Sequence, residues 1–531
     1  MLGLERVGLD DNLINLGGQS LGVMMIRNLI ASELGIEVPI SELFTFPTAR
    51  ELARTINRKI HGQQTEMPPI DTLQDIFVPS PASFQQEQIW ILCQVKRQAT
   101  SYNLPFSLRI KGPLNRLALK KSFVDLLHRH TALRTVFRQT EYQLEQLVIE
   151  KFRFFLPETD LREGDEADRK NKIDQMIAEE EERPFDLRHD LLLRAQVLRL
   201  GVDDYILLIT AHHIAVDGWS VRILFEDFNR FYRARCAGVA AELAPLSLHY
   251  VHYAAWQRKW LQGDVLAKQL SYWTNKLGSA SPLHGLLDKR DRSAVFSYRG
   301  AHHIQLISSS LFEAAKGIGE ALGATPFVVL QAAFAVVLHK AGGASDVVMG
   351  TVVAGRLQRE VESLVGMFVN TVVLRSSTFG NPTFKEFLLQ SRQMVVEALA
   401  HQSVPFEVVV AALNPKRTSQ YHPVFQIMFA FQGEQPQTHE ADATDTFLGD
   451  LSIEYEAPKK TSSKFDLTLQ AAVTRDELHL DWEYCPDLFN AQAIHRFAQS
   501  YEQVLREIVA NPLLPMDRLL AEFSLGPAFI A

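Results

Sequence analysis

The sequence predicts an α/β protein in which a small helical unit precedes a much larger unit of alternating helices and strands. Three observations lead to this prediction. Residues 1–60 contain two short helical segments, residues 61–76 are polar and include a Pro pair, and the rest of the chain alternates between helical and strand patterns. A length of 531 residues also corresponds to about three units at roughly 100–200 residues per domain.

The helical unit is expected to contain two helices. Ser20 opens an apolar periodic segment that ends near Gly35. Serine favours the start of a helix and glycine favours its end, so these residues mark the helix bounds. A second helix is expected through Ala49–Arg54.

In the larger unit, each predicted element rests on apolar patterning. Leu114–His128 and Arg222–Arg235 have helical patterns, whereas Ile206–Thr210 is short and apolar, as expected of a buried strand. Phe327–His339 is apolar on every side and follows Thr325-Pro326, which supply a cap and a first-turn proline. This combination predicts a fully buried helix.

Composition excludes several classes of protein. Lys and Arg number 54 and Asp and Glu 62, so the net charge of −8 argues against a nucleic-acid partner or a basic membrane-surface protein. Cys93, Cys236 and Cys485 lie far apart, so neither a disulfide framework nor a CxxC metal site is expected. The start of the chain has no apolar signal core, and the longest apolar stretch, Phe327–Leu338, is too short to span a bilayer. We therefore expect a cytoplasmic protein with no metal site and no membrane partner.

The first segment that could carry chemistry contains Gly17, Gly18 and Ser20. The two glycines predict a loop without side chains, which would leave the Ser20 hydroxyl exposed at the start of the helix. Backbone N–H groups and the helix dipole favour a phosphate group there, so a phosphoester on Ser20 would be stabilised. The alternative is that Ser20 is only a helix N-cap.

The second segment is His212–Gly218 (HHIAVDG), which directly follows the predicted strand. A neutral imidazole with a pKa of ~6.5 can take a proton from an attacking amine. Asp217 can orient the loop, and Gly218 permits close backbone approach to a ligand. The other histidine pair, His302-His303, is not followed by Asp-Gly and is interpreted as structural.

Both segments resemble known motifs. Asp11–Leu21 resembles the LGGxS signature of peptidyl carrier domains, and His212–Gly218 resembles the HHxxxDG motif of nonribosomal peptide synthetase condensation domains. Other segments resemble the remaining core motifs of condensation domains in the same order: Ser83–Trp90, Arg129–Phe137, Tyr250–Gln257, Val365–Thr371, His401–Glu407 and, more weakly, Arg417–Gln426.

The resemblance implies a carrier domain followed by a condensation domain. The carrier would be a small helical bundle. The condensation domain would consist of two chloramphenicol-acetyltransferase-like lobes with the active site at their junction. The implied boundaries are 1–60 for the carrier, 61–76 for a linker, 77–515 for the condensation domain (lobes about 77–258 and 259–515) and 516–531 for a tail.

The same resemblance implies a reaction. A condensation domain joins a carrier-bound aminoacyl or peptidyl thioester to the amine of a downstream carrier-bound aminoacyl acceptor, which forms a peptide bond. His213 matches the catalytic histidine, either as a general base or as the group that positions the amine. His212 and Asp217 belong to the same catalytic motif but would be more architectural. Asp217 should need a cation, and Arg134 and Arg299 are both candidates.

Ser20 would carry the cofactor 4′-phosphopantetheine, attached by a phosphopantetheinyl transferase. Partners would include upstream and downstream synthetase modules, with adenylation and acceptor carrier domains. Leu21, Met24 and Met25 would either contact partner enzymes or pack in the carrier core. Two departures from the family pattern are expected: the helix that normally precedes the loop would be missing, and Gln19 stands where a His or Asp is usual.

Two other functions stay open. An epimerisation domain shares HHxxxDG and also follows a carrier, but it would contain an EGHGRE-like segment, which we do not find. A catalytically silent platform that recruits tailoring enzymes is the alternative from another class, and the intact His213 and Gly218 argue against it. Incubation with aminoacyl carriers would separate the three, because they would give a dipeptide, an inverted Cα or no product.

Overall fold

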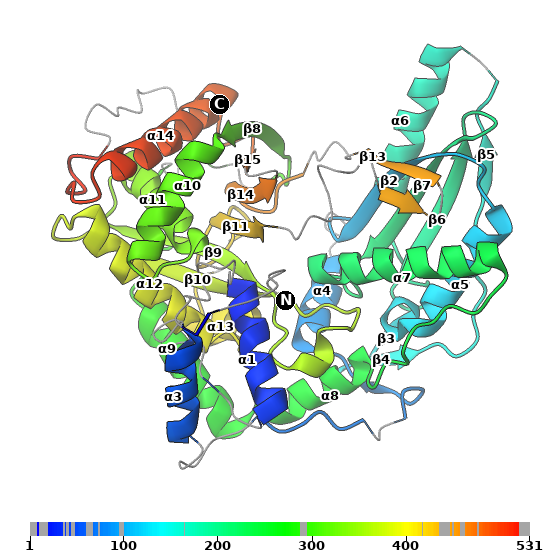
Figure 1. Ribbon diagram of the computed structural model, residues 1–531, viewed down its shortest axis with the longest axis horizontal. Coiled ribbons are helices and arrows are strands. Elements are labelled where there is room, and N and C mark those ends of the chain that lie inside the picture. The colour runs from blue at the N-terminus through cyan, green and yellow to red at the C-terminus, as the bar shows by residue number, and fades with distance from the viewer. Residues whose placement is uncertain are drawn as a thin grey trace.

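Two six-stranded sheets form the centres of two lobes that lie side by side (Figure 1). The computed structural model describes residues 8–9, 20–34, 38, 42–43, 48–59, 67–72, 75–94, 100–163, 165–286, 292, 295–416, 418–434, 446–448, 451–456, 462–474 and 477–519. Within these ranges, helices and strands alternate through both lobes, so the predicted α/β class is confirmed.

The first lobe is organised around β7, a strand that is buried along almost its whole length. Because side chains alternate between the faces of a strand, Leu207 and Ile209 pack against α5 and α7, whereas Ile206 and Leu208 face α6. The sheet order is β12-β13-β2-β7-β6-β5. Its strands are β2 (Asn103–Lys111), β5 (Glu158–Asp160), β6 (Leu193–Arg199), β7 (Asp204–His212), β12 (Thr446–Leu448) and β13 (Leu451–Glu456).

Helices cover both faces of this sheet, and a small second sheet of order β1-β4-β3 lies beside it. The predicted helix at 114–128 is α5, which begins after its N-cap Asn115, and the one at 222–235 is the longer α7. The remaining elements of the lobe are β1 (Ser80–Pro81), α4 (Phe84–Cys93), α5 (Arg116–Arg129), η1 (Thr131–Arg134), β3 (Thr135–Gln139), β4 (Leu144–Val148), α6 (Glu166–Glu182), α7 (Gly218–Ala237) and α8 (Tyr250–Trp260).

The second lobe has at its centre the predicted buried helix, α11 (Pro326–Gly342). Thr325 caps it, Pro326 occupies its first turn, and every residue from Val328 to Leu338 is buried. The sheet order is β10-β9-β11-β14-β15-β8. The strands are β8 (Ala301–Ile307), β9 (Asp346–Val353), β10 (Asn370–Ser377), β11 (Ile427–Glu434), β14 (Leu467–Thr474) and β15 (Glu477–Tyr484). The helices are α9 (Gly263–Leu277), α10 (Ser309–Ala321), η3 (Arg359–Val361), α12 (Phe384–Ala400), α13 (Phe406–Leu413) and α14 (Ala491–Ala510).

The division of the chain into lobes differs from the prediction in two segments, and the first is the stretch 361–368, whose Val361, Leu364, Val365, Met367 and Phe368 share the apolar cluster of the first lobe. Strands β12 and β13 were expected in the second lobe, but β13 pairs antiparallel with β2 and so extends the sheet of the first lobe, as Figure 1 shows. In the register, Ser452 lies opposite Lys111 and Glu456 opposite Ser107. The lobes are therefore joined by a returning segment as well as by the chain between α8 and α9.

The predicted start of the C-terminal tail, at residue 516, is too early in the chain. Met516 and Leu519 are buried in the apolar core of the second lobe, so the chain still packs there beyond residue 515.

The helical unit contains α1 (Ser20–Leu34) and α3 (Ala49–Lys59), which match both predicted helices. Val23, Leu52 and Ile56 are buried and share the apolar cluster of the second lobe. Some predictions concern parts of the chain outside the described residues. These are the loop Gly17–Gln19, the absence of a helix before it, and the side chains of Ser20, Leu21 and Met24.

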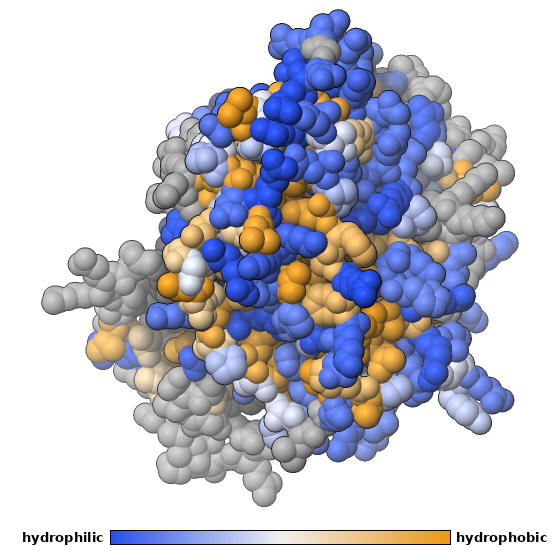
Figure 2. Space-filling model, turned by 90° about the vertical axis from the view of Figure 1, so that its right-hand side faces the viewer, coloured by the Kyte–Doolittle hydropathy of each residue, from blue (hydrophilic) through white to orange (hydrophobic). Residues whose placement is uncertain are grey.

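Figure 2 shows the face of the first lobe, which is mainly hydrophilic with smaller apolar areas between polar ones. Helix α6, on that lobe, has no fully buried residue. Across the ranges that the structure describes, no single helix is long and apolar enough to cross a membrane; α10 and α11 pass that test only as a pair, bent by 105°.

Candidate active site

The HHIAVDG segment connects the end of a buried strand to the start of a helix. Strand β7 ends at His212, and α7 begins at Gly218 with Asp217 as its N-cap. Ile214, Ala215 and Val216 between them are buried, so apolar packing fixes the loop. The backbone N–H of His213 donates to the carbonyl of Tyr102 at 2.8 Å, which ties the loop to the start of β2.

His212 packs into the first lobe. It is 1% exposed, and its Nδ1 atom accepts a hydrogen bond from the backbone N–H of Ile214 at 3.1 Å. The other ring nitrogen, Nε2, lies 3.7 Å from Sγ of Cys93, and the ring of Phe185 meets the imidazole edge-on. Burial lowers the pKa of His212 to about 3, with smaller contributions from the adjacent His213 and then from Arg194 and Lys464. The ring is therefore neutral and held in one orientation.

His213 is the more accessible member of the pair. Its ring meets that of Tyr102 edge-on at 6.4 Å between centroids. The Nδ1 atom is buried and makes no hydrogen bond with any residue in the described ranges. Burial, followed by the charge of Lys464, lowers the pKa of His213 to about 4, whereas Asp217 acts in the opposite direction. At neutral pH the imidazole is a proton acceptor.

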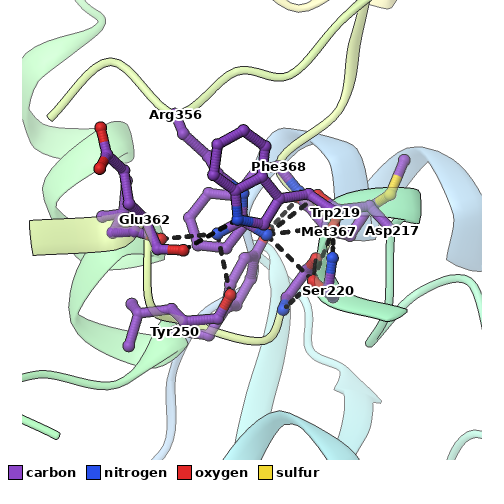
Figure 3. A network of polar contacts seen from close by, with 11 residues as sticks. Asp217, Trp219, Ser220, Tyr250, Arg356, Glu362, Met367 and Phe368 are labelled. Atoms are coloured by element: carbon purple, nitrogen blue, oxygen red, sulfur yellow. Dashed lines mark hydrogen bonds and ion pairs between the residues drawn. The ribbon is translucent and has the colours of Figure 1, made fainter. Parts of the chain in front are cut away.

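Asp217 is fully buried and accepts several hydrogen bonds (Figure 3). Its Oδ1 atom accepts from the backbone N–H and the hydroxyl of Ser220, at 2.8 and 2.6 Å, and from Nη2 of Arg356 at 3.1 Å. Its Oδ2 atom accepts from the backbone N–H of Phe368 at 3.0 Å. Because Arg356 and Phe368 lie on the connection between β9 and β10, two strands of the second lobe, one carboxylate joins the start of α7 to that connection.

The cation beside Asp217 is thus Arg356, and the prediction of Arg134 or Arg299 was wrong. The side chain of Arg134 is used within the first lobe, where it donates to the carbonyls of Leu127 and Ile149. The side chain of Arg299 is 70% exposed on the second lobe and pairs with Asp487 at 2.9 Å.

Arg356 is itself fixed from several sides. Its Nη1 atom donates to the carbonyls of Val361 and Leu364, at 2.6 and 2.8 Å, and its guanidinium lies 4.0 Å from the centre of the Phe368 ring. Burial lowers the pKa of Arg356, and Asp217 counteracts that effect. The sequence analysis did not identify Arg356. A signal was present, because Arg356 follows a glycine just after the apolar segment of β9 and precedes the segment Val365–Thr371, which resembles a condensation-domain motif.

Other contacts at the lobe junction surround this ion pair. Nε1 of Trp219 donates to the carbonyl of Glu362 at 2.9 Å, and the hydroxyl of Tyr250 donates to that of Met367 at 2.5 Å. Gly366 has no space for a side chain, because a Cβ atom there would lie 1.9 Å from the Tyr250 ring. The segment 356–368 therefore holds the start of α7 and of α8 in a close fit.

Gly218, unlike Gly366, has free space where a side chain would lie. The residue is exposed, and a Cβ atom built on it would meet nothing within 4 Å. The free space lies next to the His213 loop, at the N-terminus of α7.

Helix α1 contacts the segment 356–368. Nδ2 of Asn28 donates to the side chain of Glu362 at 2.8 Å and to the carbonyl of Arg356 at 3.2 Å. Arg27 donates to the carbonyl of Leu357 at 3.0 Å. Asn28 and Arg27 are only 3% and 7% exposed, so the helix that begins at Ser20 is packed directly against the residues that hold Asp217.

Comparison with known proteins identifies the family. Residues 79–523, more than half of the chain, match the family described as Condensation domain. The chain belongs to the condensation-domain family. Residues 1–56 match the family described as Phosphopantetheine attachment site, so a carrier region precedes the condensation domain.

The relatives of this chain are much longer synthetases, and the match covers a small part of each. The chain is 36% identical to one of the linear gramicidin synthase proteins of Brevibacillus parabrevis over 523 residues, which are 98% of this chain and 7% of the relative. It is also 35% identical to malpinin synthetase of Mortierella alpina over 499 residues, which are 93% of this chain and 6% of the relative. The chain therefore spans less than a tenth of the length of these two relatives.

A solved structure supports the two-lobed fold. The X-domain in its complex with OxyB from teicoplanin biosynthesis is similar, with a TM-score of 0.76, 25% identity and coverage of 86% of this chain and 99% of that chain. The fold expected from the motifs is thus confirmed.

Proposed function

We propose that this chain forms a peptide bond between a carrier-bound aminoacyl or peptidyl thioester and the amine of a downstream carrier-bound aminoacyl acceptor. The observation that carries the proposal is the position of His213, a neutral imidazole on a loop that Asp217 ties to Arg356 and Phe368.

The residues of the loop suit this reaction. An ammonium group must lose a proton before its nitrogen can attack the thioester carbonyl, and the neutral His213 ring can accept that proton or hold the amine in line. The N–C bond forms as the C–S bond breaks; of the two protons that the ammonium group loses, one passes to the leaving thiolate and the other to solvent. Gly218 leaves space for the reacting groups, and Asp217 holds the loop without taking part.

Ser20 is the proposed attachment site of 4′-phosphopantetheine, whose thiol would hold the donor as a thioester. The described residues fit this group, because α1 begins at Ser20 and has no acidic residue in its first turn to repel a phosphate. Intact-protein mass spectrometry after treatment with CoA and a phosphopantetheinyl transferase should give one adduct, and Ser20→Ala should give none. An adduct that persists in Ser20→Ala would rule out this site.

The proposed partners follow from the same function. Loading of the donor requires a phosphopantetheinyl transferase and an upstream adenylation domain, and the acceptor arrives on a downstream carrier. These are the partners that a fragment of a larger synthetase would meet.

Product analysis tests the function. The loaded chain is incubated with a loaded acceptor carrier, and the products are separated by mass and by chirality. We expect a dipeptide on the acceptor, lost in His213→Ala. An inverted Cα without transfer would instead indicate an epimerisation domain. If neither product forms, the result would favour a recruitment platform. That candidate has its own support, because the similar X-domain was solved in a complex with OxyB.

A further inference from the structure

A lysine from the second lobe lies at the His213 site. Nζ of Lys464 is 4.7 Å from the centre of the Tyr102 ring, a distance at which an ammonium group is attracted to an aromatic face. The carbonyl of Tyr102 in turn accepts the hydrogen bond from the backbone N–H of His213, and the two rings meet edge-on. One aromatic side chain therefore lies against both the cation and the imidazole.

The loop that carries Lys464 is firmly anchored in its own lobe. Asp466, two residues later, is 1% exposed and pairs with both His284 and Arg292. On the other side of Lys464, the backbone N–H of Ser463 donates to the carbonyl of Tyr298 at 3.0 Å. The Lys464 side chain itself is exposed.

We propose that Lys464 is a further positioning residue for the transfer reaction, a cation that the second lobe places on Tyr102 so that its charge acts on the His213 ring. The inference rests on the proposed function, since it concerns the protonation of the imidazole that the reaction would use. It makes the second lobe an electrostatic partner of the loop as well as a structural one.

The charges around His213 give the direction of the effect. Lys464 disfavours the protonated ring and Asp217 favours it, while His212 and Tyr102 face the same site as neutral groups. Tyr102 is neutral because burial, with Cys93, Glu407 and Tyr298, raises its pKa. Lys464 is thus the cation that opposes Asp217. Its removal should raise the pKa of His213, so a larger fraction of the rings would be protonated in solution near pH 4.

The test compares Lys464→Met, which removes the charge, with Lys464→Arg, which keeps it, in the full chain. Lys316→Met on α10, where the lysine pairs with Glu313, is the matched control. The ring of His213 is titrated by NMR and assigned from the resonance lost in His213→Gln. We expect the midpoint to rise by about half a pH unit or more in Lys464→Met. Lys464→Arg and Lys316→Met should titrate like the wild type.

Single-turnover transfer gives the second measurement. In Lys464→Met the acidic limb of the rate profile should move to higher pH in step with the titration, so transfer falls more near pH 4, where the His213 ring titrates, than at pH 8. An unchanged midpoint in Lys464→Met, or an equal shift in Lys464→Arg, would overturn the inference. Lys464→Gln repeats the test if the Met variant melts early. Absence of transfer in the wild type would contradict the proposed function alone, because the NMR titration is read without turnover.

Discussion

The chain contains two pairs of adjacent histidines in contrasting settings. His212 and His213 lie at the end of β7, an inner strand of the first sheet, whereas His302 and His303 lie within β8, the edge strand of the second. His212 is buried and His213 is faced by groups from both lobes. His302 pairs with Asp481 on the neighbouring strand at 2.8 Å, and its side chain is 18% exposed.

The difference shows what gives a histidine pair its chemistry. A strand that ends inside the protein places its last residues at the lobe junction, where the next helix begins and its N-cap Asp217 can be reached from the other lobe. A pair near the start of an edge strand is held by its ladder, with His302 on Asp481 of the neighbouring strand and the ring of His303 against that of His495 on α14. The two histidine pairs have the same sequence, and their positions in the sheets distinguish them.

The largest expected effect is the loss of transfer in His213→Ala, which we expect for no other histidine. His213→Ala should lower single-turnover dipeptide formation by about 10²–10⁴, the range for one general acid–base group. The thermal melt and Ser20 loading should stay unchanged, because the Nδ1 atom of the ring makes no hydrogen bond within the described ranges. Near-normal transfer with every amine tested would remove His213 from the mechanism.

His212→Ala provides the contrast within the pair. It leaves the backbone N–H of Ile214 without its acceptor and opens space beside Cys93. We expect a loss of about 1–3 kcal/mol in unfolding free energy, measured by denaturant titration. If His212→Ala instead kept full stability and lost only transfer, the division of roles between the two rings would be reversed.

Asp217 should show the next largest effect, in stability as well as activity. Asp217→Ala leaves the buried guanidinium of Arg356 without its carboxylate, which costs about 3–5 kcal/mol when a buried pair is broken on one side. The melting temperature should fall and transfer should be lost.

The exposed pair Arg299–Asp487 is the matched control for this prediction. Asp487→Ala removes the partner of an arginine whose side chain is 70% exposed, so it should cost only about 0–1 kcal/mol. Equal melting temperatures for Asp217→Ala and Asp487→Ala would show that the Asp217 network does not hold the lobes.

The sequence was sufficient for elements and motifs that are local. The all-round apolar pattern of α11 and the short apolar run of β7 correspond to buried elements. The partner of Asp217 could not be found in this way, because Arg356 lies 139 residues away and reaches it only once the lobes have packed. The same reason applies to β13, whose pairing with β2 depends on the return of the chain to the first lobe.

A smaller effect is expected where the carrier helix meets the site. Asn28→Ala leaves the buried Arg356 carbonyl and the partly buried Glu362 carboxylate without this donor, at a cost of about 1–3 kcal/mol. Alanine is a strong helix former, so α1 itself is not weakened. Hydrogen exchange in residues 356–362 should increase. Leu29→Ala, at a 41% exposed neighbour, should leave exchange unchanged, and equal exchange in both variants would contradict the contact.

The smallest effect should come from the second histidine pair. The bond between His302 and Asp481 lies on an edge strand and is partly exposed, so His302→Gln should change the unfolding free energy by only about 0–1 kcal/mol. Transfer should be unaffected, since neither residue contacts the His213 loop, Asp217 or Arg356 in the parts of the chain that the structure describes. The measurement is the same single-turnover assay and melt used for His213→Ala, in one series. A loss of transfer comparable to that of His213→Ala would mean that β8 takes part in the reaction, and the distinction drawn between an inner strand end and an edge strand would then be wrong.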